Sequence, residues 1–407
     1  MGKGFLGKIL HIDLTHRKHY VETLPEKVYQ EWYGGYGLGV KLLYEAIPRG
    51  TDPLHPENIL GFMTGLLTGT PAPFSGSFHV IGKSPITGGW GDSRCGGYFG
   101  PEIKYAGFDG ILIHGRADKP VYVSIMDDTI EFRSAEHLWG LKVKETEAQI
   151  LGDVNDKKTK VVSIGPSGEK LSLISGIVTD GGRIAARSGL GAVMGSKNLK
   201  AIAVRGTKHL EINNIDDLRE LTKQFIKVAK KNPAWDFLSK YGTSGGTASS
   251  IEVGDTPVKN WGGAPEDFPN AKKISDEAVR KIQKKKYACF GCPVGCGGIV
   301  EIQNNERIVS HKPEYETLAA FGSNCLNDDL HSIVRLNEIC NEYGLDTISA
   351  GSTLAFSLEL FERGIITKED LHGLNLRWDN NEAKEELLLL MAKREGFGEI
   401  LANGSKF

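Results

Sequence analysis

The chain has 407 residues, enough for two or three domains, and its 49 basic and 51 acidic residues leave a formal net charge of −2. A charge so close to zero gives no support for binding to nucleic acid or to an anionic membrane surface. No apolar run reaches the roughly 18 residues of a membrane span, and no apolar signal core begins the chain, so we expect a cytoplasmic protein without a membrane segment.

The first half of the chain has the pattern of a β-rich domain. Apolar and polar residues alternate over short segments, and glycine, the compositional outlier with 51 residues, is concentrated here. Short strands with brief turns favour antiparallel sheets. We expect a glycine-rich turn at 34–39, rather than a phosphate loop, opening a helix, and strands at residues 7–14, 78–82, 110–114, 121–126, 129–132, 160–165 and 199–204.

Near residue 210 the pattern becomes helical. Asn214 is a candidate N-cap for a helix that runs to about residue 231, and residues 245–270 have the composition of a loop. Further helices are expected at about 275–286, 328–343, 349–363 and 381–395, with Gly344 ending the second of them. The sequence therefore predicts an α+β fold: a β-rich, antiparallel-sheet domain over 1–208 and a mostly helical domain over 209–407.

Three of the six cysteines lie close together, in the run Cys289-Phe-Gly-Cys292-Pro-Val-Gly-Cys296. Spacers of two and three residues let three sulfurs converge on one centre, as iron–sulfur clusters and structural zinc both require. The alternative is a set of free, reduced cysteines in a turn. The preceding lysines at 284–286 are expected to end the helix that enters this loop, and Cys95, Cys325 and Cys340 are expected to be buried.

Several motifs together resemble the tungsten-containing aldehyde ferredoxin oxidoreductase family over essentially the whole chain. The resemblance implies a β-rich base for the cofactor followed by two helical domains, and oxidation of aldehydes to carboxylic acids with electron transfer to ferredoxin. The motifs are Thr68-Gly-Thr-Pro-Ala-Pro73, Lys83-Ser-Pro85, Gly100-Pro-Glu-Ile-Lys-Tyr-Ala-Gly107, Gly189-Leu-Gly-Ala-Val-Met-Gly-Ser-Lys-Asn-Leu-Lys-Ala201, the cysteine run, Pro313-Glu-Tyr-Glu316 and Tyr343-Gly-Leu-Asp346.

The resemblance also implies cofactors and the residues that hold them. It implies tungsten, or molybdenum, held by two pterins, with magnesium bridging the pterin phosphates, and a [4Fe–4S] cluster with Cys289, Cys292 and Cys296 as ligands. Glu314, with Glu316 as the alternative, would be the acid–base residue beside the metal. Pterin contacts would come from Ser77, Arg94, Gly96, Arg183, Ile184 and Ala186 in the first domain and from Asn341, Leu345 and Asp346 in the second.

The chain departs from the family pattern at several positions. Ser77 stands where an arginine is usual, Arg94 where an asparagine usually supports the magnesium, and Asn341 where an aspartate is usual. From this resemblance we expect the family's third domain to be missing from the chain. We therefore consider a fragment, a separate subunit that supplies this domain, or an altered function, and also a homodimer.

Other interpretations remain open from the sequence. Arg183 could be a surface arginine, Asp346 a helix N-cap and Glu314 an ordinary loop carboxylate. The whole protein could be a relative of the aromatic acyl-CoA reductases, or a structural subunit without cofactor. It could also be a non-catalytic zinc module in which His311 joins the three clustered cysteines.

Overall fold

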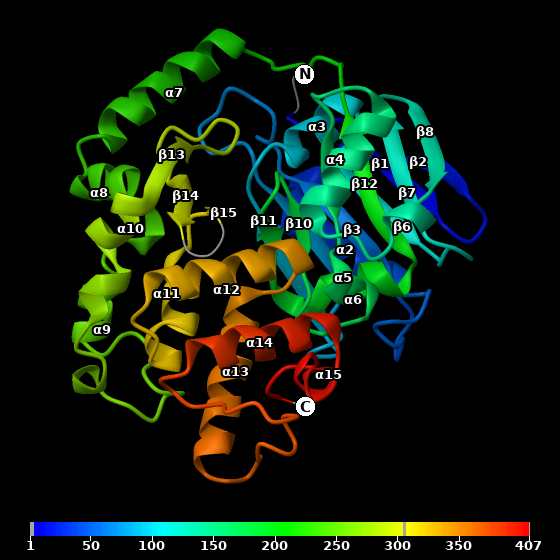
Figure 1. Ribbon diagram of the computed structural model, residues 1–407. Coiled ribbons are helices and arrows are strands. Elements are labelled where there is room, and N and C mark those ends of the chain that lie inside the picture. The colour runs from blue at the N-terminus through cyan, green and yellow to red at the C-terminus, as the bar shows by residue number, and fades with distance from the viewer. Residues whose placement is uncertain (1–3, 304–306, 407) are drawn as a thin grey trace. The chain divides into compact units, whose positions relative to one another are not determined.

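The computed structural model describes residues 4–303 and 307–406, and Figure 1 shows its helices and strands along the chain. The chain forms two compact units. Unit 1 comprises Met1–Val228 together with Cys289–Pro293, and unit 2 comprises Ala229–Ala288 and Val294–Phe407. The first part of the cysteine run thus belongs to unit 1, although the chain on either side of it belongs to unit 2.

Unit 1 contains two six-stranded sheets. The first has the strand order β2-β1-β6-β3-β4-β5, and all neighbours are antiparallel except β1 and β6. Its strands are β1 (Lys8–Asp13), β2 (Lys18–Thr23), β3 (Leu60–Thr64), β4 (Phe78–Lys83), β5 (Trp90–Cys95) and β6 (Gly110–His114).

The second sheet has the order β11-β10-β9-β12-β7-β8, with β7 and β12 as its parallel pair. Adjacent β7 and β8, which correspond to the strands expected at 121–126 and 129–132, form a hairpin. Its strands are β7 (Val121–Met126), β8 (Thr129–Ser134), β9 (Lys160–Ser163), β10 (Ile177–Thr179), β11 (Arg183–Ala185) and β12 (Leu199–Arg205).

Helices complete unit 1 as layers on and between the sheets. One apolar core joins strands of both sheets with α3 and α6, while α2 packs on the other face of the first sheet and α4 on the other face of the second. The helices are α1 (Glu26–Trp32), α2 (Gly35–Ala46), α3 (Phe99–Ala106), α4 (Val143–Val154), α5 (Pro166–Glu169), α6 (Leu190–Ser196) and α7 (Ile215–Ala229), whose last residue belongs to unit 2.

Unit 2 is mostly helical and carries one small antiparallel sheet of order β13-β14-β15. Its strands are β13 (Gln283–Tyr287), β14 (Gly297–Gln303) and β15 (Arg307–His311). The helices are α8 (Pro233–Tyr241), α9 (Thr247–Glu252), α10 (Asp276–Ile282), α11 (Tyr315–Phe321), α12 (Leu330–Tyr343), α13 (Thr347–Glu362), α14 (Asn381–Lys393) and α15 (Gly398–Leu401).

The α+β fold class predicted from the sequence is confirmed, but the two sheets of unit 1 are mixed where antiparallel sheets were expected, since each contains one parallel pair. Asn214 caps α7 by accepting a bond from the Asp217 amide at 3.1 Å, and Gly344 ends α12 with a φ of 76°. Three local expectations were wrong. Residues 34–39 do not form a turn before a helix, because α2 already begins at Gly35. The lysines at 284–286 lie in strand β13, because this segment pairs with β14 instead of continuing α10, and residues 245–270 contain the short helix α9.

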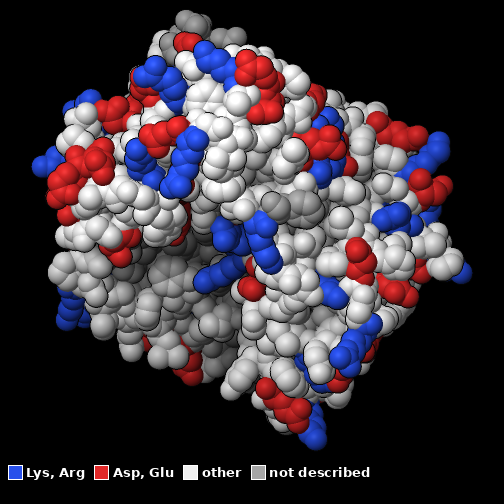
Figure 2. Space-filling view, turned by 90° about the horizontal axis from the view of Figure 1, so that it is seen from below, with Lys and Arg blue, Asp and Glu red and all other residues white. Residues whose placement is uncertain are grey.

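The surface follows the charge balance of the sequence. Acidic and basic side chains are interspersed over most of the face shown in Figure 2, consistent with the formal net charge of −2. Across the described residues, no helix combines the length and the apolar character that crossing a membrane would require.

A buried carboxylate organises the edge of unit 1 where the chain begins. Asp109 is 1% exposed and forms an ion pair with the Lys104 ammonium at 2.6 Å. It also accepts bonds from the amides of Leu6 and Gly7 and from the Tyr29 hydroxyl at 2.7–2.8 Å. Burial, and then the neighbouring carboxylate, raise the pKa of Tyr29, so its hydroxyl stays a donor. The Asp109 side chain thus connects the segment that precedes β1 with helix α1 and helix α3.

Replacing this carboxylate should destabilise unit 1 strongly. In Asp109→Asn the buried Lys104 ammonium loses its counter-charge, and we expect the free energy of unfolding to fall by about 3–5 kcal/mol. The exposed pair Lys27–Glu31 provides the control, because Glu31→Gln should cost less than about 1 kcal/mol. Urea denaturation measures both variants, and an Asp109→Asn protein as stable as the wild type would contradict the role assigned to Asp109.

Candidate cofactor site

A cavity of about 490 Å³ lies in unit 1 at the N-terminal end of α2. Ser77 and Arg94 both line it, and the Arg94 guanidinium donates a hydrogen bond to the Ser77 hydroxyl at 3.0 Å. The two side chains meet because β4 and β5 pair with residue 79 opposite residue 94. The cavity therefore presents a cation and a hydroxyl beside the backbone of Gly34, Gly35 and Gly65.

His79 lines the same cavity and was not among the residues expected from the sequence. Its Nδ1 atom is buried and has no hydrogen-bond partner among the described residues. Burial lowers the pKa of this imidazole more than the nearby Asp92 raises it. A neutral ring with an unsatisfied nitrogen suits a polar ligand. No local pattern in the sequence indicated His79, because its place in the cavity depends on the pairing of β4 with β5.

A second group of expected residues lies where β5 and β11 meet. The amide of Arg187 donates to the Ser93 hydroxyl at 3.2 Å, which holds the segment after β11 against β5. Gly96 follows β5, while Arg183 and Ile184 belong to β11 and Ala186 follows it. The structure thus brings these four residues to one edge of unit 1.

Cys289 is placed against this edge. The Arg183 guanidinium donates to the Cys289 sulfur at 2.9 Å. A Cβ atom at Gly96 would lie 2.7 Å from the same sulfur, so no other residue fits there without displacing the cysteine. Gly96, Arg183 and Cys289, which are far apart in the sequence, form one contact.

The residues after Cys289 are held by backbone and aromatic contacts within unit 1. The Phe290 amide donates to the Gly97 carbonyl at 3.1 Å, and the Phe74 amide donates to the Gly291 carbonyl at 2.9 Å. The Phe290 ring meets Tyr98 and Tyr105 edge to face, with centroid distances of 6.3 Å. The chain turns back after Cys289, where the Cys292 amide donates to the Cys289 carbonyl at 3.1 Å.

Cys296, the third cysteine of the run, belongs to unit 2. Its carbonyl accepts a bond from the Lys312 ammonium at 2.8 Å, and Lys312 also donates to the Tyr241 carbonyl at 2.6 Å. Burial lowers the pKa of Lys312. Among the described residues no three His, Cys, Asp or Glu side chains form a ready metal site. His311, the zinc ligand of the alternative interpretation, bonds the Tyr287 hydroxyl through Nδ1 at 2.5 Å.

The second pterin segment expected from the sequence lies in unit 2 between α12 and α13. Asn341 is 5% exposed, and its Nδ2 atom has no hydrogen-bond partner among the described residues. Leu345 is fully buried. Asp346 is the N-cap of α13, as one of its interpretations predicted, and accepts bonds from the amides of Ile348 and Ser349 at 3.1–3.2 Å. An unsatisfied buried amide is where a polar ligand would bind.

The two candidate acid–base residues differ in their surroundings. Glu314 is the extended N-cap residue of α11, partly buried, and accepts a hydrogen bond from the Thr243 hydroxyl. The same hydroxyl accepts a hydrogen bond from the Tyr315 amide at 3.1 Å. Glu316 lies in the first turn of α11 and is exposed. Among the described residues, Glu314 is the one of these two carboxylates that a hydroxyl from another segment holds in a fixed orientation.

The remaining cysteines are core residues. Cys95, Cys325 and Cys340 are 3%, 0% and 0% exposed. Burial raises the pKa of Cys325 to about 12, and it raises the pKa of Cys95 and Cys340 as well. These three thiols are therefore neutral at neutral pH and poorly suited to binding a metal.

Comparison with known proteins shows the family to which the chain belongs. Residues 9–206 match the family described as aldehyde ferredoxin oxidoreductase, N-terminal domain, and residues 220–407 match aldehyde ferredoxin oxidoreductase, domains 2 & 3. The tungsten-containing aldehyde ferredoxin oxidoreductase of Pyrococcus furiosus is 42% identical over 405 residues, covering 99% of this chain and 66% of the relative. The aliphatic sulfonate oxidoreductase, WOR-like subunit, of the same organism is 35% identical over 420 residues, 98% of this chain and 66% of that relative.

A solved structure with the same fold is the active site complex BamBC of benzoyl coenzyme A reductase in complex with 1,5-dienoyl-CoA. It is 31% identical, with a TM-score of 0.87, and the match covers 100% of this chain and 63% of the other. The chain belongs to the tungsten-containing aldehyde ferredoxin oxidoreductase family, and it spans 66% of the length of its relative in Pyrococcus furiosus.

The close packing around the cysteine segment can be tested at Gly76. A Cβ atom there would lie 2.6 Å from the Gly97 carbonyl oxygen and 2.9 Å from the Phe290 backbone. We expect Gly76→Ala to lower the free energy of unfolding by about 1–3 kcal/mol and to raise the reaction rate of Cys289 with a thiol reagent. Gly152→Ala is the control, because nothing lies within 4 Å of that site in helix α4. Equal thiol reactivity in both variants would show that the segment is not tightly held.

Proposed function

We propose that this protein is a tungstopterin oxidoreductase that oxidises aldehydes to carboxylic acids and passes the electrons to ferredoxin or a similar one-electron carrier. The observation that carries the proposal is the contact of Cys289 with Arg183 and Gly96, because it joins the candidate cluster ligands to the strands expected to hold a pterin. In this proposal residues 1–208 form the base for the cofactor, and 209–407 supply the second pterin segment.

The described residues fit an anionic pterin. Arg94, Ser77 and the amides at the start of α2 would donate hydrogen bonds to the phosphate oxygens of a bound pterin, and those phosphates would hold the magnesium. Gly96, Arg183, Ile184 and Ala186 would line the pterin edge. In unit 2, the unsatisfied Nδ2 of Asn341 would donate to a pterin acceptor, with Leu345 and Asp346 beside it.

The cluster proposal rests on the thiols of the cysteine run. Cys289, Cys292 and Cys296 would be three ligands of a [4Fe–4S] cluster, since only eight residues of chain contain all three. The neutral, buried thiols Cys325 and Cys340 are poor candidates for the fourth ligand. The exposed lysines of β13 precede the run and give an acidic carrier a place to approach.

In the chemistry we propose, the bound tungstopterin supplies the two-electron oxidation of the aldehyde. Glu314 holds or removes a proton at the substrate or at an attacking water, and the Thr243 hydroxyl keeps its carboxylate in one orientation. Glu316, exposed in the first turn of α11, remains the alternative.

A second candidate function follows from the fold comparison. The BamBC chain, whose title names benzoyl coenzyme A reductase, matches all of this chain with a TM-score of 0.87. We therefore propose reduction of an aromatic acyl thioester as the alternative activity of the same site. Assays with an aldehyde and with benzoyl-CoA, each with a viologen dye as electron carrier, separate the two, and activity with neither would contradict both.

Replacing Glu314 tests the proposed acid–base role. In Glu314→Gln we expect the assembled enzyme to keep its tungsten and pterin, measured by elemental analysis and pterin fluorescence, while turnover falls by about 10²–10⁴-fold. Glu316→Gln is the matched control and should retain most activity. If the two variants behave in the opposite way, Glu316 is the acid–base residue, and if both stay active, neither carboxylate has this role.

Arg183 should tune the proposed cluster. A positive donor bonded to a ligand sulfur stabilises the reduced state, so Arg183→Gln should lower the cluster's reduction potential by on the order of 50 mV. Arg133→Gln removes the same charge from β8, at the far edge of the sheet, and should leave the potential unchanged. Potentiometric titration followed by electron paramagnetic resonance measures both. An unchanged potential in Arg183→Gln would show that Cys289 does not bind the cluster.

A further inference from the structure

A second and larger groove in unit 1 lies between α2 and the facing ends of β4 and β5. Its volume is about 850 Å³, which falls within the roughly 300–1,000 Å³ of typical small-molecule sites. Tyr36 lines both this groove and the cofactor cavity, and the other lining residues of the groove differ from those of the cavity. Nothing in the proposed oxidoreductase chemistry uses it.

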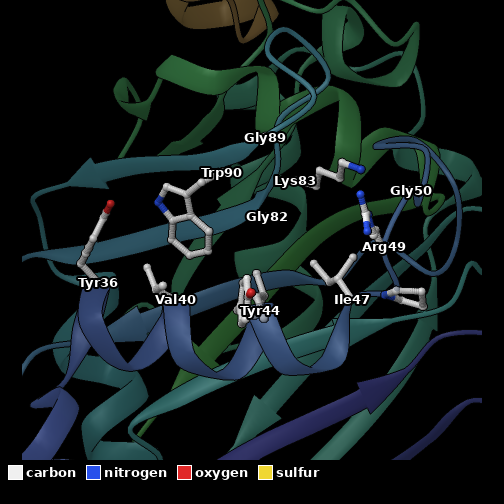
Figure 3. A pocket seen from close by; sticks show the side chains of 12 residues that line it. Tyr36, Val40, Tyr44, Ile47, Arg49, Gly50, Gly82, Lys83, Gly89 and Trp90 are labelled. Carbon is white, nitrogen blue, oxygen red and sulfur yellow. The ribbon is translucent and has the colours of Figure 1, made fainter.

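One wall of the groove is apolar and elongated. Tyr36, Val40 and Tyr44 recur at intervals of four residues along α2, so they share one face of the helix, and Ile47 follows at its end. Eleven residues of rise give this wall a length of about 16 Å. Figure 3 shows Trp90 above it, and its ring meets Tyr36 edge to face with a centroid distance of 5.6 Å.

The groove carries two cations at one end. Figure 3 shows Arg49 and Lys83 there, with the Arg49 guanidinium directed toward the Lys83 side chain. Among the described residues Arg49 has no hydrogen bond or ion pair, and none of the described residues that line the groove is acidic. The Lys83 ammonium donates to the Thr51 carbonyl at 2.5 Å and keeps further N–H groups for another acceptor. Two cations that face the same space favour an anion between them.

We propose that this groove binds an amphipathic organic carboxylate. The apolar body of the ligand, an alkyl chain or an aromatic ring, lies along the α2 wall beneath Trp90, and the carboxylate lies between Arg49 and Lys83. A simple inorganic anion would leave the apolar wall exposed, and a neutral apolar molecule would leave the two cations without a counter-charge. The inference does not depend on the proposed oxidoreductase activity.

The test uses decanoate as the probe, with decan-1-ol and acetate as matched compounds. Isothermal titration calorimetry of the full protein should show saturable binding of decanoate and no measurable binding of acetate. The affinity for decan-1-ol should be lower than that for decanoate by a factor of about five or more. Decanoate should also change the tryptophan fluorescence of the wild type, and this change should be lost in Trp90→Phe, which locates the ligand in the groove.

Two variants separate the cationic end from the apolar wall. Arg49→Gln should weaken decanoate binding by about fivefold and leave decan-1-ol binding unchanged, while Lys27→Gln, an exposed charge on α1, should change neither. Val40→Trp should fill the groove and abolish the binding of both decanoate and decan-1-ol. A thermal unfolding midpoint near that of the wild type would show that this variant is folded.

Three outcomes would overturn the proposal. They are the absence of saturable decanoate binding, equal affinities for decanoate and decan-1-ol, and decanoate binding that is insensitive to Arg49→Gln. A fourth is concentration-dependent self-association that Val40→Trp abolishes, because it would assign the groove to a polypeptide surface instead.

Discussion

The candidate site depends on one constraint, which is the tight packing of the segment Cys289–Pro293 against the rest of unit 1. Gly76 and Gly96 leave no space for a Cβ atom, so the backbone of Phe290 and the sulfur of Cys289 lie directly against neighbouring backbone. A larger residue at either position would move the sulfur away from Arg183. Contact distance therefore requires glycine at both positions, and the position of the Cys289 thiol depends on the absence of two side chains.

The charged residues of unit 1 have two separate roles, which burial distinguishes. Lys104 pairs with Asp109, and Lys200 pairs with Glu169, and all four side chains are at most 4% exposed. Lys197 is buried against the carbonyls of Pro56 and Gly115, and burial lowers its pKa to about 7. Such groups hold the fold together. The cations that line cavities are different, because Arg94 and Arg49 are exposed and can bind a ligand without breaking a structural pair.

The sequence predicted the local elements better than the cavities they enclose. The pattern of the sequence predicted the two strands that form β7 and β8, and Asn214 and Gly344 marked helix ends correctly. The lysines of β13 were placed in a helix because charged residues carry no strand signal, and the pairing partner β14 lies beyond the cysteine run. His79 was missed for a related reason, since its role depends on which strand lies opposite, which no local pattern encodes.

The same cross-strand pairing connects two departures from the family pattern that look independent in the sequence. Residues 77 and 94 are distant along the chain, yet β4 and β5 pair so that residue 79 lies opposite 94 and residue 78 opposite 95. The Arg94 guanidinium consequently reaches the Ser77 hydroxyl at 3.0 Å. A positive charge therefore lies beside position 77 although residue 77 is serine. If both positions held arginine, the two guanidinium groups would lie close together. Coulomb repulsion disfavours that arrangement unless an anion lies between them.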